Sequence, residues 1–173
     1  MQPIVITLSE EQKARANQEA ERRQSENEKR GLRGRNNAPA TGSLALSMHK
    51  LGAVGEMAAA VCLGLEGQVF SSPSAVRGSS DLPGDIEVKT RGKHRYDLIV
   101  QGNERLDKKI VLVTVEGDTI LLHGWCVAGE VMKREYWADP ARGRPAYFVP
   151  KTALRPIETL IPVKADQTLQ PYD

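Results

Sequence analysis

The sequence predicts an α+β fold, in which a central mixed or mostly antiparallel sheet is flanked by few helices. Apolar residues follow helical spacing over residues 51–65, and Gly64 and Gly67 are placed to end that helix. Short apolar and β-branched runs then follow one another with turn residues between them, a pattern typical of consecutive strands. A length of 173 residues suffices for one domain with its core plus an extension. The predicted strands cover residues 68–71, 86–89, 96–100, 110–115, 119–126 and 146–149.

The first 43 residues predict a charged helical arm and a linker. Ile4 to Leu8 predicts a short strand, and Ser9 is placed to cap the helix that follows. Residues 10–30 consist mainly of good helix formers and contain almost no large apolar side chain, so this helix buries little by itself. We expect it to be either a solvated arm or a partner-binding element. The predicted organisation is an arm and linker at 1–43, a globular domain at 44–160 and a loose tail at 161–173.

Composition narrows the class of protein. The net charge is only +2, so any affinity for nucleic acid must come from local basic patches. Aromatic residues make up 5% of the chain, which argues against a base-stacking surface. Cys62 and Cys126 lie far apart in apolar surroundings, and we expect free thiols rather than a disulfide or zinc ligands. The absence of a long apolar run and of a secretory signal predicts a cytoplasmic protein that does not enter membranes.

The strongest functional signal is the segment from Asp81 to Lys89, DLPGDIEVK. Its Pro-Gly pair predicts a tight turn, and the alternation that follows predicts a half-buried strand. Side chains two residues apart on a strand share a face, so Glu87 and Lys89 emerge together while Val88 faces the core. The turn can bring Asp81 back toward Glu87, so that two carboxylates and an ammonium group meet at one point. Such a group can hold a hard divalent cation beside a water, which predicts hydrolysis of a phosphodiester.

With one further acid, this segment resembles the PD-(D/E)XK nuclease superfamily, the fold of restriction endonucleases, phage exonucleases and Holliday-junction resolvases. The resemblance rests on Gly52-Ala-Val-Gly-Glu56 opening a helix, then Asp81, then Glu87-Val88-Lys89, and it covers roughly residues 50–126. The order of the segments after residue 124 is similar to that of phage or bacterial members. The resemblance implies a restriction-endonuclease-like mixed sheet and an endonuclease or exonuclease that acts on DNA with Mg²⁺ or Mn²⁺.

The resemblance also implies a role for each matching residue. Asp81 and Glu87 would be metal ligands, and the carbonyl oxygen of Val88 would add a third. Lys89 would orient or deprotonate the attacking water and offset negative charge in the transition state. Near a metal and partly desolvated, this lysine is expected to have a lowered pKa. Glu56 would complete the catalytic site from the helix, directly or through water.

Other interpretations of these residues stay open. Only five residues separate Asp81 from Glu87, fewer than the family usually has, so Asp85 competes for the role given to Asp81. Glu87 and Lys89 would also suit a surface hairpin with an incidental ion pair. Glu56 would equally suit a cap near the start of a helix, facing solvent.

Basic residues near the acids predict the DNA interface. Phosphate contacts of this kind give affinity without sequence choice. A homodimer would supply the two sites needed to cut both strands of a duplex. Two rival functions are a non-catalytic nucleic-acid-binding module that keeps the fold, and an interaction protein whose polar N-terminal helix docks a partner. The predicted DNA contacts are Arg91, Lys93, Arg95, Arg142 and Arg144, with the basic stretch from Lys29 to Arg35 as either a strap or a solvated tail.

Overall fold

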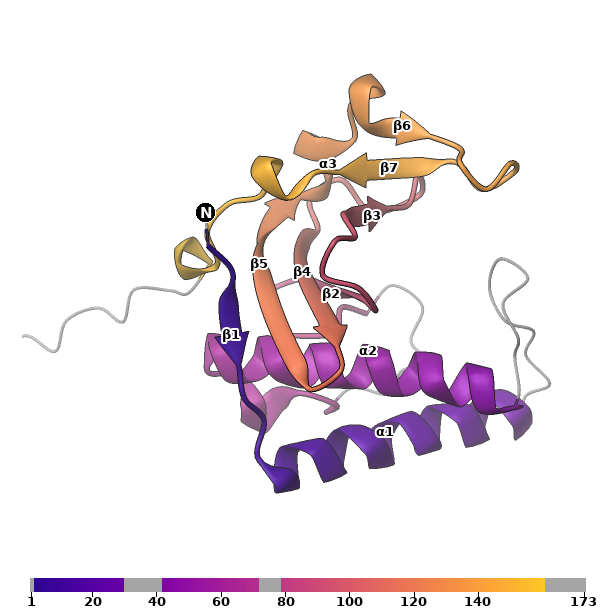
Figure 1. Cartoon of the computed structure of the whole chain (residues 1–173), viewed down its shortest axis with the longest axis vertical. Coiled ribbons are helices and arrows are strands. Elements are labelled where there is room, and N and C mark those ends of the chain that lie inside the picture. Colours follow the sequence, from indigo (N-terminus) through magenta and orange to yellow (C-terminus); the bar gives the residue numbers. More distant parts are fainter. Residues whose placement is uncertain (1, 30–41, 72–78, 161–173) are drawn as a thin grey trace, which may run out of the picture.

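The computed structural model describes residues 2–29, 42–71 and 79–160, which fold into three layers (Figure 1). Helices α1 and α2 form the first layer, a mixed four-stranded sheet forms the second, and a small antiparallel sheet forms the third, which confirms the predicted α+β class. Most of the predicted linker, its basic stretch from residue 30 to 35 and the predicted C-terminal tail lie outside the described residues. The helices are α1 (Glu10–Lys29), α2 (Gly42–Leu63) and α3 (Ala128–Val131), and the strands are β1 (Ile4–Ile6), β2 (Ile86–Arg91), β3 (Leu98–Val100), β4 (Lys109–Glu116), β5 (Thr119–Val127), β6 (Trp137–Ala138) and β7 (Ala146–Val149).

The N-terminal segment is part of the fold. Strand β1 pairs antiparallel with β5, and α1 lies along α2 (Figure 1). Of the two alternatives expected for the helix at residues 10–30, the solvated arm is wrong over its described part, because Ala16 and Ala20 are fully buried in the core beside α2. Such small side chains let two helices approach closely even where large apolar residues are lacking. Ser9 caps α1 as predicted: its hydroxyl oxygen accepts from the Gln12 N–H at 3.2 Å, and the Gln12 side chain accepts from the Ser9 N–H at 2.8 Å.

Helix α2 is longer than the sequence predicts. It begins at Gly42 rather than near residue 51, but it ends as expected at Leu63, where Gly64 adopts the left-handed conformation with φ +70°. Gly55 lies directly against Thr90 of β2, and a methyl group in its place would meet the Thr90 hydroxyl oxygen at 1.9 Å. Glycine is therefore required here, and it sets the close approach of α2 and β2.

The larger sheet has the strand order β1-β5-β4-β2, so β1 and β2 are its outer strands. Strands β4 and β5 form the predicted hairpin, which turns at Gly117 with φ +58°, and β2 runs parallel to β4. The strand predicted at 68–71 is wrong: Glu66–Gln68 form a 3₁₀ helix, and Val69 is buried in the core beneath the sheet. So short an apolar run carries no periodicity that distinguishes a strand from a buried turn.

The smaller sheet has the order β3-β7-β6, with antiparallel pairs throughout. The strands predicted at 96–100 and 146–149 appear in it as β3 and β7. The parallel connection from β2 to β4 passes through β3, so this crossover supplies an outer strand of the smaller sheet. Further short 3₁₀ helices in the described ranges are Arg134–Tyr136, Lys151–Ala153 and Ile157–Thr159.

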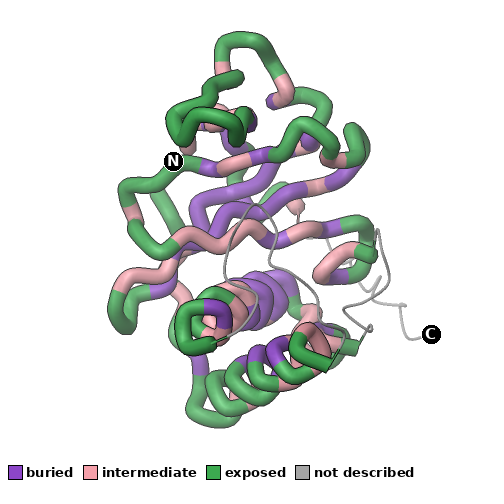
Figure 2. Tube along the Cα trace, turned by 90° about the vertical axis from the view of Figure 1, so that its right-hand side faces the viewer, coloured by how far each residue is buried: buried purple, intermediate pink, exposed green. Residues whose placement is uncertain are grey.

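Two buried clusters join the layers, and Figure 2 shows the buried residues gathered in the middle of the molecule. The first lies between the helices and the larger sheet and includes Met57, Val88 and Val111. The second lies between the two sheets and includes Leu98 and Leu112. Val88 therefore faces the helices, and its neighbours on β2 face the smaller sheet, as the predicted alternation requires.

Both cysteines are free thiols, as expected, with Cys126 buried and Cys62 half-buried. None of the helices in the described part of the chain is long and apolar enough to cross a bilayer.

Candidate functional site

A tight hairpin brings Asp81 back to strand β2. Leu82 and Ile86 exchange two backbone hydrogen bonds, of 3.0 and 3.4 Å, and the turn between them uses positive φ at Gly84 and Asp85. At the end of the turn, a side-chain oxygen of Asp81 accepts from the backbone N–H of Val88 at 2.8 Å. The carboxyl group of Asp81 thus lies against the backbone of β2 between Glu87 and Lys89.

Asp85, the competing candidate, lies on the outside of the same turn. Its side chain is 57% exposed and forms an ion pair with Arg105 at 3.0 Å. Ser80 donates a further hydrogen bond of 3.4 Å to the Asp85 carboxylate. Of the two aspartate side chains, Asp81 is therefore the one that bonds to β2.

Glu87 and Lys89 pair with each other and with a second acid and lysine. The Lys89 ammonium donates to one carboxylate oxygen of Glu87 at 2.7 Å, and Lys108 donates to the other at 2.9 Å. Glu104 approaches both ammonium groups, at 3.5 Å from Lys89 and 3.7 Å from Lys108. Two carboxylates and two ammonium groups therefore close a ring on the face of β2 that is turned toward the smaller sheet.

Lys108 and Glu104 were not predicted. Lys108 is buried, with 6% of its surface exposed, although it stands in a polar turn of the sequence. The turn docks on the rest of the chain through backbone bonds, since the Lys108 carbonyl accepts from Ala128 N–H at 2.9 Å. One sequence feature could have indicated its role, namely the position of Lys108 immediately before β4. Because β4 pairs parallel with β2, the start of β4 lies beside Glu87 near the start of β2.

Glu56 is the fourth predicted site residue, and it is held from the N-terminal helix. Both of its carboxylate oxygens accept from the Arg23 guanidinium, at 2.7 Å each, and Glu56 is only 6% exposed. The interpretation of Glu56 as a solvent-facing cap is wrong, because α2 starts several turns earlier. Glu19 also accepts from Arg23 at 2.7 Å. Burial lowers the pKa of Arg23, but its hydrogen bonds and attraction to these two acids outweigh burial and raise it.

The charges of three acids act on one another. Burial raises the pKa of Asp81 to about 7, with Glu56 and Glu87 adding to the rise, while the Val88 N–H and the Lys89 ammonium oppose it. The surroundings of Asp81 therefore disfavour its ionised form, and a cation bound nearby would stabilise that form.

The pKa of Lys89 is raised, not lowered as expected for a lysine beside a bound metal ion. Burial acts to lower its pKa, but Glu87, Glu104 and Asp81 together raise it. The pKa of Glu87 is lowered, since Lys89 and Lys108 outweigh the effect of burial. Both groups are thus held in their charged forms.

The donor atoms fit a hard divalent cation in type. Asp81, Glu87 and Glu56 offer carboxylate oxygens, which Mg²⁺ and Mn²⁺ prefer. Among the described residues, no three His, Cys, Asp or Glu side chains lie close enough together to hold one metal ion. To hold one, Glu87 and Glu56 would have to exchange their lysine and arginine partners for the ion.

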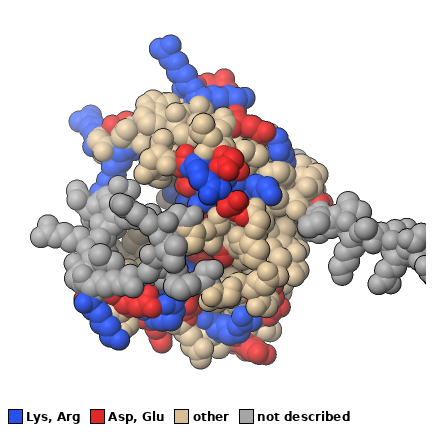
Figure 3. Space-filling view, turned by 180° about the vertical axis from the view of Figure 1, so that it is seen from behind, with Lys and Arg blue, Asp and Glu red and all other residues tan. Residues whose placement is uncertain are grey.

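The residues predicted to contact DNA fall into two places. Arg91, Lys93 and Arg95 lie at the end of β2 and in the loop after it, whereas Arg142 and Arg144 lie in the loop between β6 and β7 (Figure 1). Lys93 is paired with Glu116 at 2.9 Å. Figure 3 shows acidic and basic side chains grouped together on the rear face, in agreement with such local pairing.

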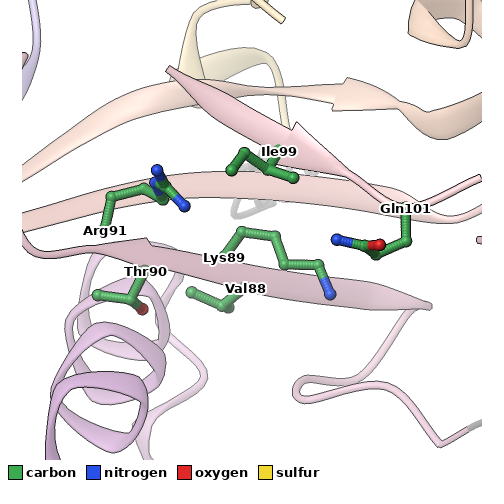
Figure 4. A pocket seen from close by; sticks show the side chains of 6 residues that line it. All are labelled: Val88, Lys89, Thr90, Arg91, Ile99 and Gln101. Atoms are coloured by element: carbon green, nitrogen blue, oxygen red, sulfur yellow. The ribbon is translucent and has the colours of Figure 1, made fainter. Parts of the chain in front are cut away.

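A cavity of about 250 Å³ adjoins the ring of charges between β2 and β3. Figure 4 shows Lys89 and Arg91 rising from β2 toward β3, while Val88 and Thr90 point toward the helix below. Ile99 and Gln101, from β3 and just after it, form the opposite wall.

Comparison of the chain with protein-family models, with curated proteins and with solved structures finds no match. The chemistry of the residues gathered around Asp81 and β2 is therefore what bears on function.

Proposed function

We propose that this protein is a divalent-metal-dependent nuclease that hydrolyses phosphodiester bonds of DNA, with a restriction-endonuclease-like core of the PD-(D/E)XK type. The observation that supports this most directly is the contact of Asp81 with the backbone of Val88, between Glu87 and Lys89. The tight turn thus gathers the acid, acid and lysine of the motif at one end of a strand. The mixed sheet, with α2 and Glu56 packed on one face, agrees with the same proposal.

Each residue has a role in the proposed reaction. Asp81, Glu87 and the Val88 carbonyl, with Glu56 directly or through water, would hold Mg²⁺ or Mn²⁺. Such an ion, when bound, acidifies water and stabilises negative charge on phosphoryl oxygens. Lys89 is held protonated beside Glu87, which supports a role in donating to the water or phosphate and in offsetting charge rather than in taking up a proton. A homodimer would let two such sites act on the two strands of DNA.

The direct test is cleavage of plasmid and branched DNA in Mg²⁺ and in EDTA. We expect cleavage only with the metal, and a loss of about a hundredfold or more in rate for Glu87→Gln and Lys89→Met. Glu130→Gln and Lys133→Met serve as matched controls, because these residues lie on and just after α3, outside the proposed site. The proposal fails if the parent protein cuts neither substrate, or if the site variants cut as fast as the controls.

A second candidate is a DNA-binding protein that keeps the fold without catalysis. It is favoured by the saturation of Glu56 with Arg23 and of Glu87 with Lys89 and Lys108, which balances these acids without an ion. It predicts DNA binding that weakens with salt and is indifferent to EDTA, with no cleavage under any condition.

A further inference from the structure

Arg91 is a half-buried cation that lacks a counterion in the described part of the chain. Its Nε is buried without a hydrogen-bond partner. The carboxylate that most affects it, Asp97, is paired with Lys151 at 3.6 Å instead. What remains is the face of the Tyr96 ring, 5.0 Å from the guanidinium carbon. Burying an unpaired cation is unfavourable, so an anion is expected to complete this arrangement.

Two other arginines that lie over an aromatic ring do have carboxylate partners. Arg23 lies over Phe70 at 5.7 Å and grips Glu56, and Arg155 lies over Trp125 at 4.8 Å and grips Glu130. A ring beneath the guanidinium is common to all three, and Arg91 is the one of the three that has no carboxylate partner among the described residues. Arg95 lies over the same Tyr96 ring at 5.0 Å and likewise has none there, but Arg95 is exposed to water whereas Arg91 is half-buried. Arg91 is also the one of these three that lines the cavity between β2 and β3.

The cavity has the dimensions and chemistry of an oxyanion site. Its volume of about 250 Å³ exceeds that of several water molecules, at roughly 30 Å³ each. Lys89 and Arg91 enter it from the same side of β2, about 7 Å apart along the strand, and the amide of Gln101 lies across from them (Figure 4). Since the charges of Lys89, Lys108, Glu87 and Glu104 balance within their ring, Arg91 leaves the cavity with a net positive charge.

We propose that this cavity is a phosphate subsite, in which Arg91 binds one backbone phosphate of a nucleic-acid strand adjacent to the phosphate that reaches Glu87 and Lys89. This rests on the proposed function for the identity of the substrate. The planar fork of arginine matches phosphate oxygens in geometry. Both β2 and β3 are outer strands of their sheets, and the cavity lies between them, so a polymer can enter it from outside the sheets. A free phosphate would satisfy Arg91 equally, and the experiment separates the two.

The test compares the parent protein with Arg91→Gln, Arg91→Lys and Arg155→Gln, the last as the control arginine that lies over a ring but outside the cavity. Binding of a fluorescent single-stranded and a duplex oligonucleotide is measured by anisotropy in EDTA, over a range of salt concentrations. We expect Arg91→Gln to raise the dissociation constant about tenfold and to reduce the salt slope by about 0.7 to 0.9, one phosphate contact. Arg91→Lys should retain the slope but only part of the affinity, and Arg155→Gln should match the parent.

Inorganic phosphate is the second probe. Its binding to the parent protein is followed by NMR through the Nε–H resonance of Arg91. The dispersion of the amide resonances in the same spectra shows whether each variant is folded. We expect a saturable shift that disappears when the oligonucleotide is already bound. If phosphate shifts the resonance but Arg91→Gln leaves oligonucleotide affinity unchanged, the site takes a free anion and the assignment to a strand phosphate is overturned. If neither probe depends on Arg91, the subsite itself is overturned.

Cleavage in Mg²⁺ distinguishes this failure from failure of the proposed function. If the parent protein cleaves DNA and Arg91→Gln cleaves it with the same KM, the subsite proposal is overturned and the nuclease proposal is supported. Arg91-dependent oligonucleotide binding in a protein that never cleaves would support the subsite and remove the catalytic proposal.

Discussion

Arg23 of α1 holds both carboxylate oxygens of Glu56 on α2, at 2.7 Å each, across 33 residues of sequence. This bidentate pair is almost fully withdrawn from water on the Glu56 side. The N-terminal helix thus bonds directly to Glu56, one of the acids of the proposed metal site.

Removal of Arg23 alone should strongly destabilise the protein. Arg23→Met would leave Glu56 buried and unpaired, and we expect the free energy of unfolding to fall by about 3 to 5 kcal/mol. The double variant Arg23→Met/Glu56→Met should lose less than the sum of the two single variants, as measured by urea denaturation. Lys13→Met, which breaks an exposed ion pair on the same helix, should leave the midpoint unchanged. Additive losses in the double variant would show that the two side chains are not coupled.

Asp81 should make stability depend on pH and on metal. Its pKa of about 7 exceeds the ordinary 3.8, so the folded protein binds this proton more tightly than the unfolded chain. The resulting stabilisation is complete below about pH 4 and is lost as the pH rises through 7. Asp81→Asn keeps an acceptor for the Val88 N–H without the charge, and should therefore be more stable than the parent at pH 8 in EDTA.

Addition of Mn²⁺ at pH 8 should reverse that order, since an ion bound to the folded state stabilises it. The thermal midpoint of the parent should rise with Mn²⁺ and that of Asp81→Asn should not. Asp85→Asn, on the outside of the turn, should respond to Mn²⁺ as the parent does. An equal response of all three proteins would exclude Asp81 as a ligand.

The contact between Gly55 and Thr90 should be intolerant of a single methyl group. Gly55→Ala places a carbon 1.9 Å from the Thr90 hydroxyl oxygen, and we expect a loss of about 1 to 3 kcal/mol in unfolding free energy. Adding Thr90→Ala should restore only part of it, because the Thr90 Cβ remains 2.8 Å away. Gly67→Ala, which meets open space, is the control for the helix propensity of alanine. A Gly55→Ala protein as stable as this control would mean that α2 can move away from β2 freely.

His123 should weaken the fold in acid. It is buried in β5, its Nε2 lies 2.7 Å from the Thr114 hydroxyl, and burial together with Lys151 and His94 lowers its pKa to about 4. Because the folded pKa lies below the ordinary 6.5, its contribution to stability is present above pH 6.5 and is lost as the pH falls toward 4. His123→Gln does not titrate, so the stability of the parent relative to this variant should decline between pH 7 and 4.5 in urea denaturation. A constant difference over that range would contradict the prediction.

Local chemistry made part of the site predictable. The Pro83-Gly84 turn, the alternation of Ile86 and Val88, and the spacing of Glu87 and Lys89 are all encoded within nine residues, and the hairpin forms as these signals indicate. The strand order within the β4–β5 hairpin follows from its turn in the same way.

Contacts between distant segments were not predictable in this way. Nothing near Arg23 in the sequence indicates that its partner is Glu56, because the pairing depends on how closely α1 and α2 pack through their buried alanines. Lys108 reaches Glu87 only through the parallel pairing of β4 with β2, which a single sequence does not specify. The same reason explains the misjudged N-terminal helix: its burial is a property of its partner, not of its own composition.

The position of β2 at the margin of the larger sheet has a further consequence. An outer strand can leave backbone groups unpaired along one side, where it is a template for joining the sheet of another molecule. In β2, Leu82 and Asp81 already bond the backbone of Ile86 and the N–H of Val88, so this side is open only beyond Val88. Glu87, Lys89 and Arg91 place a charged side chain at every second position of this strand, a pattern that discourages such association. Variants that neutralise these residues to probe catalysis therefore also remove a guard against aggregation, and their solubility should be measured before any loss of activity is assigned to chemistry.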